Sequence, residues 1–543
     1  MSDTQTSWPK LASRYSIRAS LTLLSIVLLV IPFATAWYLH VLGLQVTEQF
    51  PTAPAVLSAD QLAAAQAASR ALPGRTPPVV LSYHDVRPAV PTEKYPNPLT
   101  NPGYHYVVTP EAFDAQLTAL AAAGYSSLTS DQYVDYLSGG EIPERSVLIT
   151  FDDGTHGLWT YADAILERHR MNGVAFLITG NVGAKRPYYL TWQEIDRMAA
   201  TGRWDFESHT RKMHARMPID THGQQASEMV HRRWLFEFNR RETLAEFELK
   251  IRQDLKGSIE DIVAHGLPRP RLFAFPFSEG YRDTTGGDPQ AAAVAAGVVR
   301  EMFVCGFNNA PPQPLPSGAR AAAVGMVGRI ELTLDSTVED LIDKVRARTP
   351  VTPAQAPPSA RTDLWTLLDD SPAPARPNGG EVRLNGTGTW EGIAYGRHST
   401  ADWASYRGSV TVHGLSANGV ENAAVVTRIG TGKEVSAQVS SDRMRLTVGL
   451  GANPVVVGEL PLPQSDAHTV DFTVSPTSTD VVVDGSHRLS ARSDGGPDAY
   501  GGIGLTSSRK TNTAPWPVFD ELSVSEGAPA PNVRAGVGVP LPG

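Results

Sequence analysis

The stretch Ser146-Val147-Leu148-Ile149-Thr150-Phe151-Asp152-Asp153-Gly154 decides the fold. An apolar run ends abruptly in two carboxylates and a glycine, which is typical of a buried strand with acidic side chains at its carboxyl end. Open and barrel-like α/β folds keep their chemistry at that edge. Because successive side chains on a strand point to opposite faces, we expect Asp152 and Asp153 to have different roles.

Strand-like and helix-like segments alternate on both sides of this stretch. Expected strands cover residues 79–83, 174–178, 204–208, 272–275 and 302–305. Expected helices cover residues 110–124, 161–169, 191–200, 243–265, 291–296 and 338–345. This alternation predicts a parallel α/β sheet, either open or closed into a barrel.

Composition limits the classes of function. A chain of 543 residues with 41% hydrophobic residues is long enough for two or three domains with sizeable cores. Its formal net charge of -9 argues against nucleic-acid binding, which requires basic patches. The single cysteine, Cys305, excludes a disulfide within the chain and a zinc–thiolate site. Any metal must therefore be held by histidines and carboxylates.

The amino-terminal region predicts a membrane anchor. Residues 21–44 are almost wholly apolar and long enough to cross a bilayer as one helix. Basic residues in 1–20 predict that this end stays in the cytoplasm and that the rest is exported. A cleaved signal peptide is the alternative, since residues 34–36 resemble a cleavage site. We favour the uncleaved anchor because the apolar run continues beyond that point.

The rest of the chain divides by composition. We expect a spacer at 45–77, an α/β domain at 78–348 and a Pro- and Ala-rich linker at 349–380, with a possible helical contact at 364–370. Residues 381–527 predict an all-β sandwich, and 528–543 a disordered tail. The expected sandwich strands cover 409–412, 425–429, 435–439, 445–448, 469–474 and 480–483.

A histidine pair completes a possible metal site. His209 follows the expected strand 204–208, and His214 lies five residues further on. Taken alone, two histidines in a loop are more often ordinary surface residues. With Asp153 they make a set of two imidazoles and one carboxylate, which leaves coordination positions open for water and substrate. Asp152 would then be available as a general base.

Two motifs in these stretches resemble a known family. Residues 150–154 and the Ser208-His209-Thr210…His214 pattern are similar to the first two motifs of the polysaccharide deacetylases (NodB-homology, carbohydrate esterase 4). The five-residue histidine spacing resembles the biofilm deacetylases that act on poly-β-1,6-N-acetylglucosamine. Over about 78–347, the resemblance implies a distorted (β/α) barrel, often of seven strands, and hydrolytic N-deacetylation.

The resemblance also implies roles for individual residues. Asp152 matches the catalytic base, while Asp153, His209 and His214 match the ligands of a divalent metal ion, usually zinc. Two family features are missing. Residues 274–278 lack the arginine that usually tethers the base, and no histidine between His265 and His398 can supply the usual late general acid. Asp152 could therefore have to act as both base and acid, and Arg329 could pair either with a site carboxylate or with acidic neighbours.

Other residues each allow a functional and a structural interpretation. His84 ends a strand and could belong to the site or make a structural hydrogen bond. Trp192 could contact sugar or pack in a helix core, and backbone N–H groups near Phe277 could bind an oxyanion. Residues 232–241 are rich in Arg and aromatics, so they could bind an anionic polymer or form a solvated insertion.

The β domain resembles concanavalin-like lectin or laminin-G-like sandwiches at residues 501–505 and 518–522. It could bind glycan, or serve only for packing and spacing. The candidate sugar contacts, which could equally be core residues, are Trp390, Tyr395, Trp403 and Trp516.

We therefore expect a single-pass membrane protein whose extracellular domain deacetylates poly-β-1,6-N-acetylglucosamine. Its expected partners are the polysaccharide, the membrane and a membrane glycosyltransferase, with no nucleic acid. The alternatives are a chitin or peptidoglycan deacetylase, and a non-catalytic glycan-binding protein on a decayed barrel.

Overall fold

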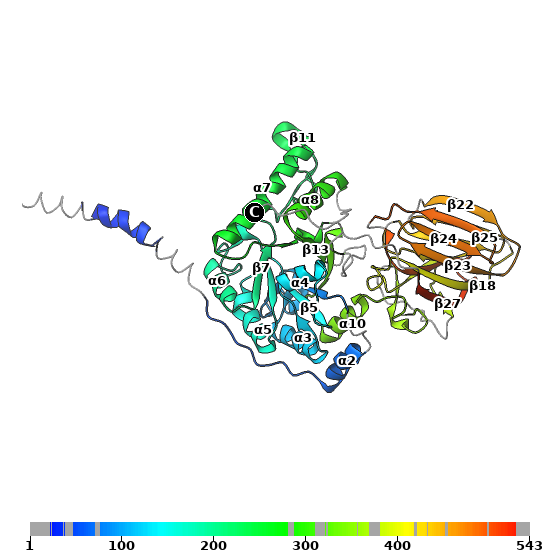
Figure 1. Ribbon diagram of the computed structural model, residues 1–543. Helices are drawn as coiled ribbons and strands as arrows, with labels where there is room; N and C mark the ends of the chain where they lie inside the picture. Colours follow the sequence, from blue (N-terminus) through cyan, green and yellow to red (C-terminus); the bar gives the residue numbers. More distant parts are fainter. Residues whose placement is uncertain are drawn as a thin grey trace, which may run out of the picture.

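The chain forms an α/β domain followed by a β domain (Figure 1). The computed structural model describes residues 22, 24–35, 37, 47–70, 76–280, 287–309, 321, 324–355, 357–368, 381–417, 421–431, 433–450, 454–496 and 499–527. The expected cytoplasmic end at 1–20 and the expected tail at 528–543 lie outside these residues, as does the linker from 369 to 380.

Seven parallel strands close into a barrel within the described residues. Neighbouring strands follow the order β1-β14-β13-β12-β7-β6-β5, and pairing of β5 with β1 completes the ring. Strand β4 (Ser126–Ser127) pairs with the first two residues of β5. The barrel strands are β1 (Val79–Tyr83), β5 (Ser146–Phe151), β6 (Gly173–Leu177), β7 (Trp204–Ser208), β12 (Leu272–Ala274), β13 (Cys305–Asn309) and β14 (Met326–Glu331). The expected α/β fold is confirmed, in its closed form.

Helices surround the barrel, and several begin at strong capping signals. They are α3 (Pro110–Ala122), α4 (Ser130–Leu137), α5 (Asp163–His169), α6 (Trp192–Ala200), α7 (Leu244–Ala264), α8 (Pro289–Met302) and α10 (Val338–Arg348). Thr191, Thr243 and Thr337 each form a capping box at the start of α6, α7 and α10. Because a helix that follows a barrel strand begins near that strand's carboxyl end, these caps lie toward the edge where the acidic residues emerge.

One expected strand is wrong. Residues 302–305 were expected to be extended, but Met302 ends α8 and the strand begins only at Cys305. Asp288 caps the helix by accepting a hydrogen bond from the N–H of Ala291, and the Ala- and Val-rich sequence continues beyond the expected end at 296. Val298 and Val299, beyond that end, are buried in the same core cluster as Phe273 and Phe303, so tertiary contact supports the longer helix.

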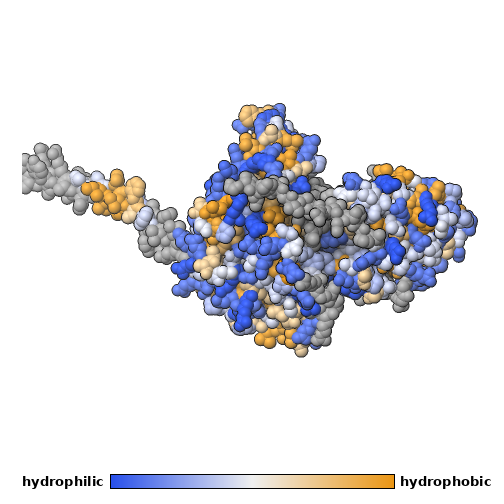
Figure 2. All heavy atoms as spheres, in the orientation of Figure 1, coloured by the Kyte–Doolittle hydropathy of each residue, from blue (hydrophilic) through white to orange (hydrophobic). Residues whose placement is uncertain are grey.

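The amino-terminal region has an apolar helix and a segment bound to the barrel. Residues 24–35 are helical, and their large apolar side chains are exposed, which Figure 2 shows as an orange stretch. Within the described parts of the chain, no helix combines the length and apolarity needed to cross a bilayer. Further on, the N–H of Ala55 donates to Asp114 Oδ2 over 2.6 Å, and α2 (Ala59–Arg70) packs against α3 and α10. This part of the expected spacer therefore lies on the barrel surface.

The β domain is a sandwich of two antiparallel sheets. One has the order β15-β17-β26-β19-β20-β21-β22 and the other β16-β27-β18-β23-β24-β25. The first contains β15 (Trp365–Leu367), β17 (Trp390–Tyr395), β19 (Asn422–Thr427), β20 (Val435–Ser440), β21 (Arg443–Val448), β22 (Val455–Pro461) and β26 (Ile503–Ser508). The second contains β16 (Val382–Arg383), β18 (Tyr406–His413), β23 (Ala467–Ser475), β24 (Ser478–Val483), β25 (His487–Arg492) and β27 (Val518–Glu526). The expected sandwich is thus present, and each of its six expected strands lies in one of these strands or overlaps it.

The segment between the domains contributes to the sandwich. Residues 365–367, within the expected linker, form β15 and pair with β17 instead of forming the expected helical contact. Just after α10, the N–H of Val351 donates to the carbonyl of Ser399, and its own carbonyl accepts from Trp403 Nε1 over 2.7 Å. The chain leaving the barrel is therefore hydrogen-bonded directly to the β domain.

Candidate metal centre

Asp153, His209 and His214 meet at the carboxyl edge of the barrel. One ligand atom from each lies within 4.8 Å of the others. Asp153 Oδ1 is 3.6 Å from His209 Nε2 and 3.4 Å from His214 Nε2. Strands β5 and β7 deliver the residues to this edge, with β6 between them. The set expected from the sequence is therefore brought together by the fold.

Backbone turns aim these side chains into one place. Asp153 has a φ of 72° and Thr210 a φ of 76°, both in the left-handed region that ordinary residues avoid. Such strain persists where surrounding structure enforces it, and it concentrates at functional sites. The loop between the histidines is held by α7, because Asp254 accepts hydrogen bonds from the N–H groups of Arg211 and Lys212, each at 2.8 Å.

The donor set fits a divalent cation. His209 is buried, and its Nδ1 lies 2.8 Å from the carbonyl of Ala274, which leaves Nε2 to face Asp153. Burial lowers the pKa of His209 to about 4, so its imidazole is neutral near pH 7. Asp153 Oδ1 is buried without a hydrogen-bond partner. Two imidazoles and a carboxylate oxygen with no other partner are the ligands expected at an open divalent metal site.

Asp152 is held from the opposite side by Arg329. Arg329 Nη1 donates to Asp152 Oδ1 over 2.7 Å, and Nη2 donates to Oδ2 over 2.6 Å. Nη1 also reaches Thr150 Oγ1 at 3.1 Å. Burial would raise the pKa of Asp152, but the charge of Arg329 and its hydrogen bonds outweigh burial and hold that pKa well below its usual range. Asp152 is therefore ionised.

Arg329 supplies the tether that the sequence lacked at residues 274–278. It comes from β14, which lies next to β1, and β1 pairs with β5. Its side chain is completely buried, and its guanidinium lies 5.6 Å from the ring centre of Phe176. The signal in the sequence was one arginine within the apolar stretch 326–331, whose partner could be chosen only once the barrel closed.

His84 and Phe277 lie beside this centre. The N–H of Asp152 donates to the carbonyl of Tyr83, so His84 follows β1 next to Asp152. His84 Nδ1 is buried and has no hydrogen-bond partner, and its ring lies 4.6 Å from that of Tyr106. Phe277, with a φ of 59°, places its ring 4.7 Å from His214. Tyr106, which no sequence pattern marked, is half exposed beside these groups.

Trp192 has a different neighbour. Its ring stacks on that of His265 with 3.7 Å between centroids and an interplanar angle of 11°. It also packs against the main barrel core. These contacts favour the packing role over the sugar contact.

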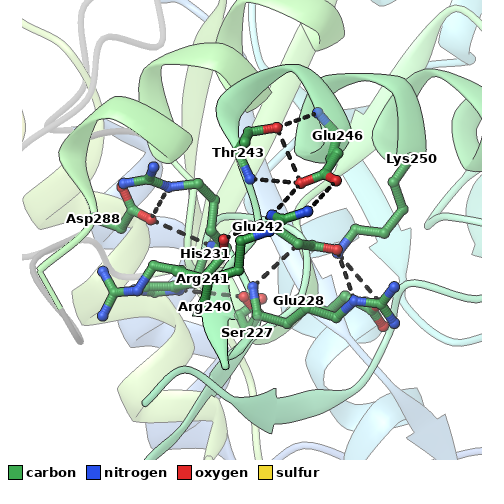
Figure 3. A network of polar contacts seen from close by, with 12 residues as sticks. Ser227, Glu228, His231, Arg240, Arg241, Glu242, Thr243, Glu246, Lys250 and Asp288 are labelled. Atoms are coloured by element: carbon green, nitrogen blue, oxygen red, sulfur yellow. Dashed lines mark hydrogen bonds and ion pairs between the residues drawn. The ribbon is translucent and has the colours of Figure 1, made fainter. Parts of the chain in front are cut away.

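Arginines of the basic segment at residues 232–241 pair with carboxylates. Arg232 pairs with Asp288 at 2.8 Å, Arg233 with Glu242 at 2.7 Å and Arg240 with Glu246 at 2.7 Å. Figure 3 shows Asp288, Glu242 and Glu246 among the basic side chains, and Lys250 Nζ lies 3.0 Å from Glu242 Oε2. The contacts favour an insertion stabilised by ion pairs over a site for an anionic polymer.

Comparison with known proteins identifies the domain. Residues 139–296 match the family model described as polysaccharide deacetylase. A poly-beta-1,6-N-acetyl-D-glucosamine N-deacetylase of Staphylococcus epidermidis is 33% identical over 142 residues, covering 25% of this chain and 49% of that protein. The enzyme of the same name from Staphylococcus aureus is 32% identical over 148 residues, covering 25% and 49%. The chain thus spans about half the length of these curated relatives, and it contains a polysaccharide deacetylase domain.

Two solved structures are each similar to a part of this chain. A de-N-acetylase from Aggregatibacter actinomycetemcomitans is 20% identical with a TM-score of 0.40, covering 48% of this chain and 97% of that one. The carbohydrate-binding module CBM66 from Bacillus subtilis is 13% identical with a TM-score of 0.23, covering 30% and 96%.

The buried ion pair between Arg329 and Asp152 leads to a prediction about the stability of the protein. Arg329→Met leaves the Asp152 carboxylate buried and unpaired, so we expect the free energy of unfolding to fall by about 3–5 kcal/mol. Adding Asp152→Asn should recover most of that loss, as measured by urea unfolding at pH 7. Arg252→Met, which removes two exposed ion pairs, with Glu248 and Glu301, should cost only about 1 kcal/mol. An equal effect of the Arg329 and Arg252 substitutions would contradict the assignment.

The set of Asp153, His209 and His214 leads to a prediction about the metal content of the protein. We expect the purified protein to bind one divalent ion, and Asp153→Asn or His209→Ala to weaken binding by at least about 100-fold. Metal analysis after dialysis, with circular dichroism to confirm folding, measures this. His222→Ala, which removes an exposed histidine, is the matched control and should leave metal binding unchanged.

Proposed function

We propose that this polysaccharide deacetylase domain hydrolyses the acetamide groups of an extracellular N-acetylglucosamine polymer, with poly-β-1,6-N-acetylglucosamine as the first candidate. The observation that carries the proposal is the pairing of an open Asp153–His209–His214 metal site with an ionised Asp152 held by Arg329. The polymer is suggested by the names of the staphylococcal relatives.

The residues divide the reaction between them. A divalent ion held by Asp153, His209 and His214, for which zinc is our first choice, supplies Lewis acidity toward the acetamide carbonyl and the attacking water. Asp152 accepts the proton of that water, and Arg329 fixes both of its oxygens for the transfer. Because Arg329 favours the ionised form, the protonated Asp152 is in turn a strong acid, and its proton passes on to the leaving amine. The backbone N–H of Phe277 can assist at the oxyanion.

His84 is the best-placed proton donor for the leaving amine. It lies next to Asp152 across the β1–β5 ladder, and its Nδ1 is buried without a partner. A buried polar atom without a partner is costly unless a ligand satisfies it. His84 would thus replace the late histidine that is missing from the sequence, and Asp152 would not have to act alone.

We also propose that the protein is a single-pass cell-membrane protein with its catalytic domain outside. The exposed apolar side chains of residues 24–35 and the preceding basic residues support an anchor at 21–44. Thr47 then contacts the start of α6, where its N–H donates to Glu194 Oε1 over 3.1 Å. Because helix starts lie at the carboxyl edge of the barrel, the anchor would leave on the side of the metal centre. That position suits a polymer delivered by a membrane glycosyltransferase.

Acetate release from defined oligomers tests the activity. We expect release from β-1,6-linked N-acetylglucosamine oligomers, loss of release with a chelator, and a fall of about 10³-fold in Asp152→Asn protein. Preference for β-1,4-linked oligomers would instead indicate a chitin or peptidoglycan deacetylase. Polymer binding by metal-loaded protein that releases no acetate would indicate a non-catalytic glycan-binding protein.

The role of His84 has a specific signature. His84→Gln should lower kcat on the amide substrate by about 100-fold. It should change the hydrolysis of an activated aryl acetate much less, since a phenolate leaves without a proton. His222→Gln is the control for a histidine outside the site. Equal losses on both substrates would argue that His84 has only a structural role.

A further inference from the structure

A groove crosses the outer face of the seven-stranded sheet in the β domain. Its volume is about 390 Å³, and its lining includes Trp390, Ser436, Gln438, Thr447 and Thr506. A second hollow of about 180 Å³ shares Gln438 with it and continues over β20 and β21. The two together make an elongated surface on a domain that carries none of the metal-site residues.

The strand pattern explains why the groove is open. In β20, Val435, Ala437 and Val439 point into the sandwich core, so residues 436 and 438 face outward. Across the sheet, Gly392, Thr506, Ala424 and Gln438 stand in one row of paired residues. Of this row, Thr506 and Gln438 line the groove.

Trp390 is the aromatic residue available to such a ligand. Its side chain is 55% exposed, whereas Tyr395 and Trp403 are 0% and 4% exposed in the core. Trp516 is partly buried against that core and covered by the guanidinium of Arg509 at 4.3 Å. Of the four aromatics proposed as sugar contacts, Trp390 alone thus keeps a large free surface. An exposed indole offers a flat apolar face, which suits the apolar face of a sugar ring.

Two hydroxyl groups in the groove have no partner. Ser436 and Thr447 are each 2% exposed, and neither side-chain oxygen makes a hydrogen bond. They stand opposite each other on β20 and β21. Buried hydroxyls are normally hydrogen-bonded, so an unpaired couple lining a groove indicates a polar ligand that completes them.

The charges beside the groove are balanced. Arg445 and Arg443 both pair with Glu459, at 2.6 and 3.1 Å, and Asp442 lines the same hollow as these arginines. A ligand held by an indole face and two hydroxyl groups needs no charge of its own, and an N-acetylglucosamine unit has none.

We propose that this groove binds an N-acetylglucosamine stretch of the polymer, with Trp390 stacked on a sugar ring and Ser436 and Thr447 hydrogen-bonded to its polar groups. The identity of the polymer rests on the function proposed above. The groove gives the enzyme a second binding site for its substrate, separate from the metal centre.

Binding of the full chain to acetylated polymer tests the proposal. The measurement uses protein with His209→Ala, so that no acetyl group is removed during the experiment. We expect Trp390→Ala to weaken binding of the polymer about tenfold, while Phe238→Ala, a similarly exposed aromatic on the barrel insertion, changes nothing.

Thr447→Val provides a second test that does not depend on tryptophan packing. It removes one unpaired hydroxyl with little change of shape, so polymer binding should fall several-fold while the melting temperature stays the same or rises. Unchanged binding in both the Trp390 and Thr447 variants would overturn the proposal. Acetate release from short oligomers, measured with His209 intact, should be unaffected by either variant, so failure of the groove is distinguishable from failure of the proposed activity.

Discussion

The Arg329–Asp152 ion pair depends on closure of the barrel. A fully buried guanidinium has lost its hydration, and only a close, bidentate carboxylate with further hydrogen bonds can compensate for that loss. Asp152 ends β5 and Arg329 lies in β14, on opposite sides of β1. If β1 did not pair with both strands, each charge would be buried alone. The stability of the barrel and the orientation of the base are therefore two results of the same contact.

The metal centre uses a different device. Its residues are brought together by strand ends that turn sharply, with Asp153 and Thr210 in left-handed backbone conformations. Such turns are unfavourable by themselves, and the surrounding hydrogen bonds from α7 and β12 keep them in place. Adjacent carboxylates on one strand end thus serve two environments. Asp152 faces a cation supplied by the protein, and Asp153 has a free oxygen beside two imidazoles.

In the β domain, the groups that folding leaves without partners are uncharged. Its core side chains are satisfied by packing, whereas its outer face carries an exposed indole and two buried hydroxyls that nothing in the described chain completes. Unsatisfied groups mark His84 and Asp153 in the barrel in the same way. In both domains, some of the polar atoms that folding leaves without partners thus line a site where a ligand or substrate would satisfy them.

The sequence by itself determined the local elements and most of the chemistry. Alternating strand-like and helix-like segments predicted the α/β domain, short strands predicted the sandwich, and the acidic strand end with the nearby histidine pair predicted the set of Asp152, Asp153, His209 and His214. These signals act over a few residues. Where tertiary contact overrides local pattern, prediction failed, as in the strand expected at 302–305 and in the linker segment that became β15. Only the tertiary structure decided which partner Arg329 takes, that His84 lies beside Asp152, and that Trp390 faces a groove while Trp403 lies in the core. Those choices depend on strand order, barrel closure and sheet facing, which join residues far apart in the chain and leave no trace in local spacing.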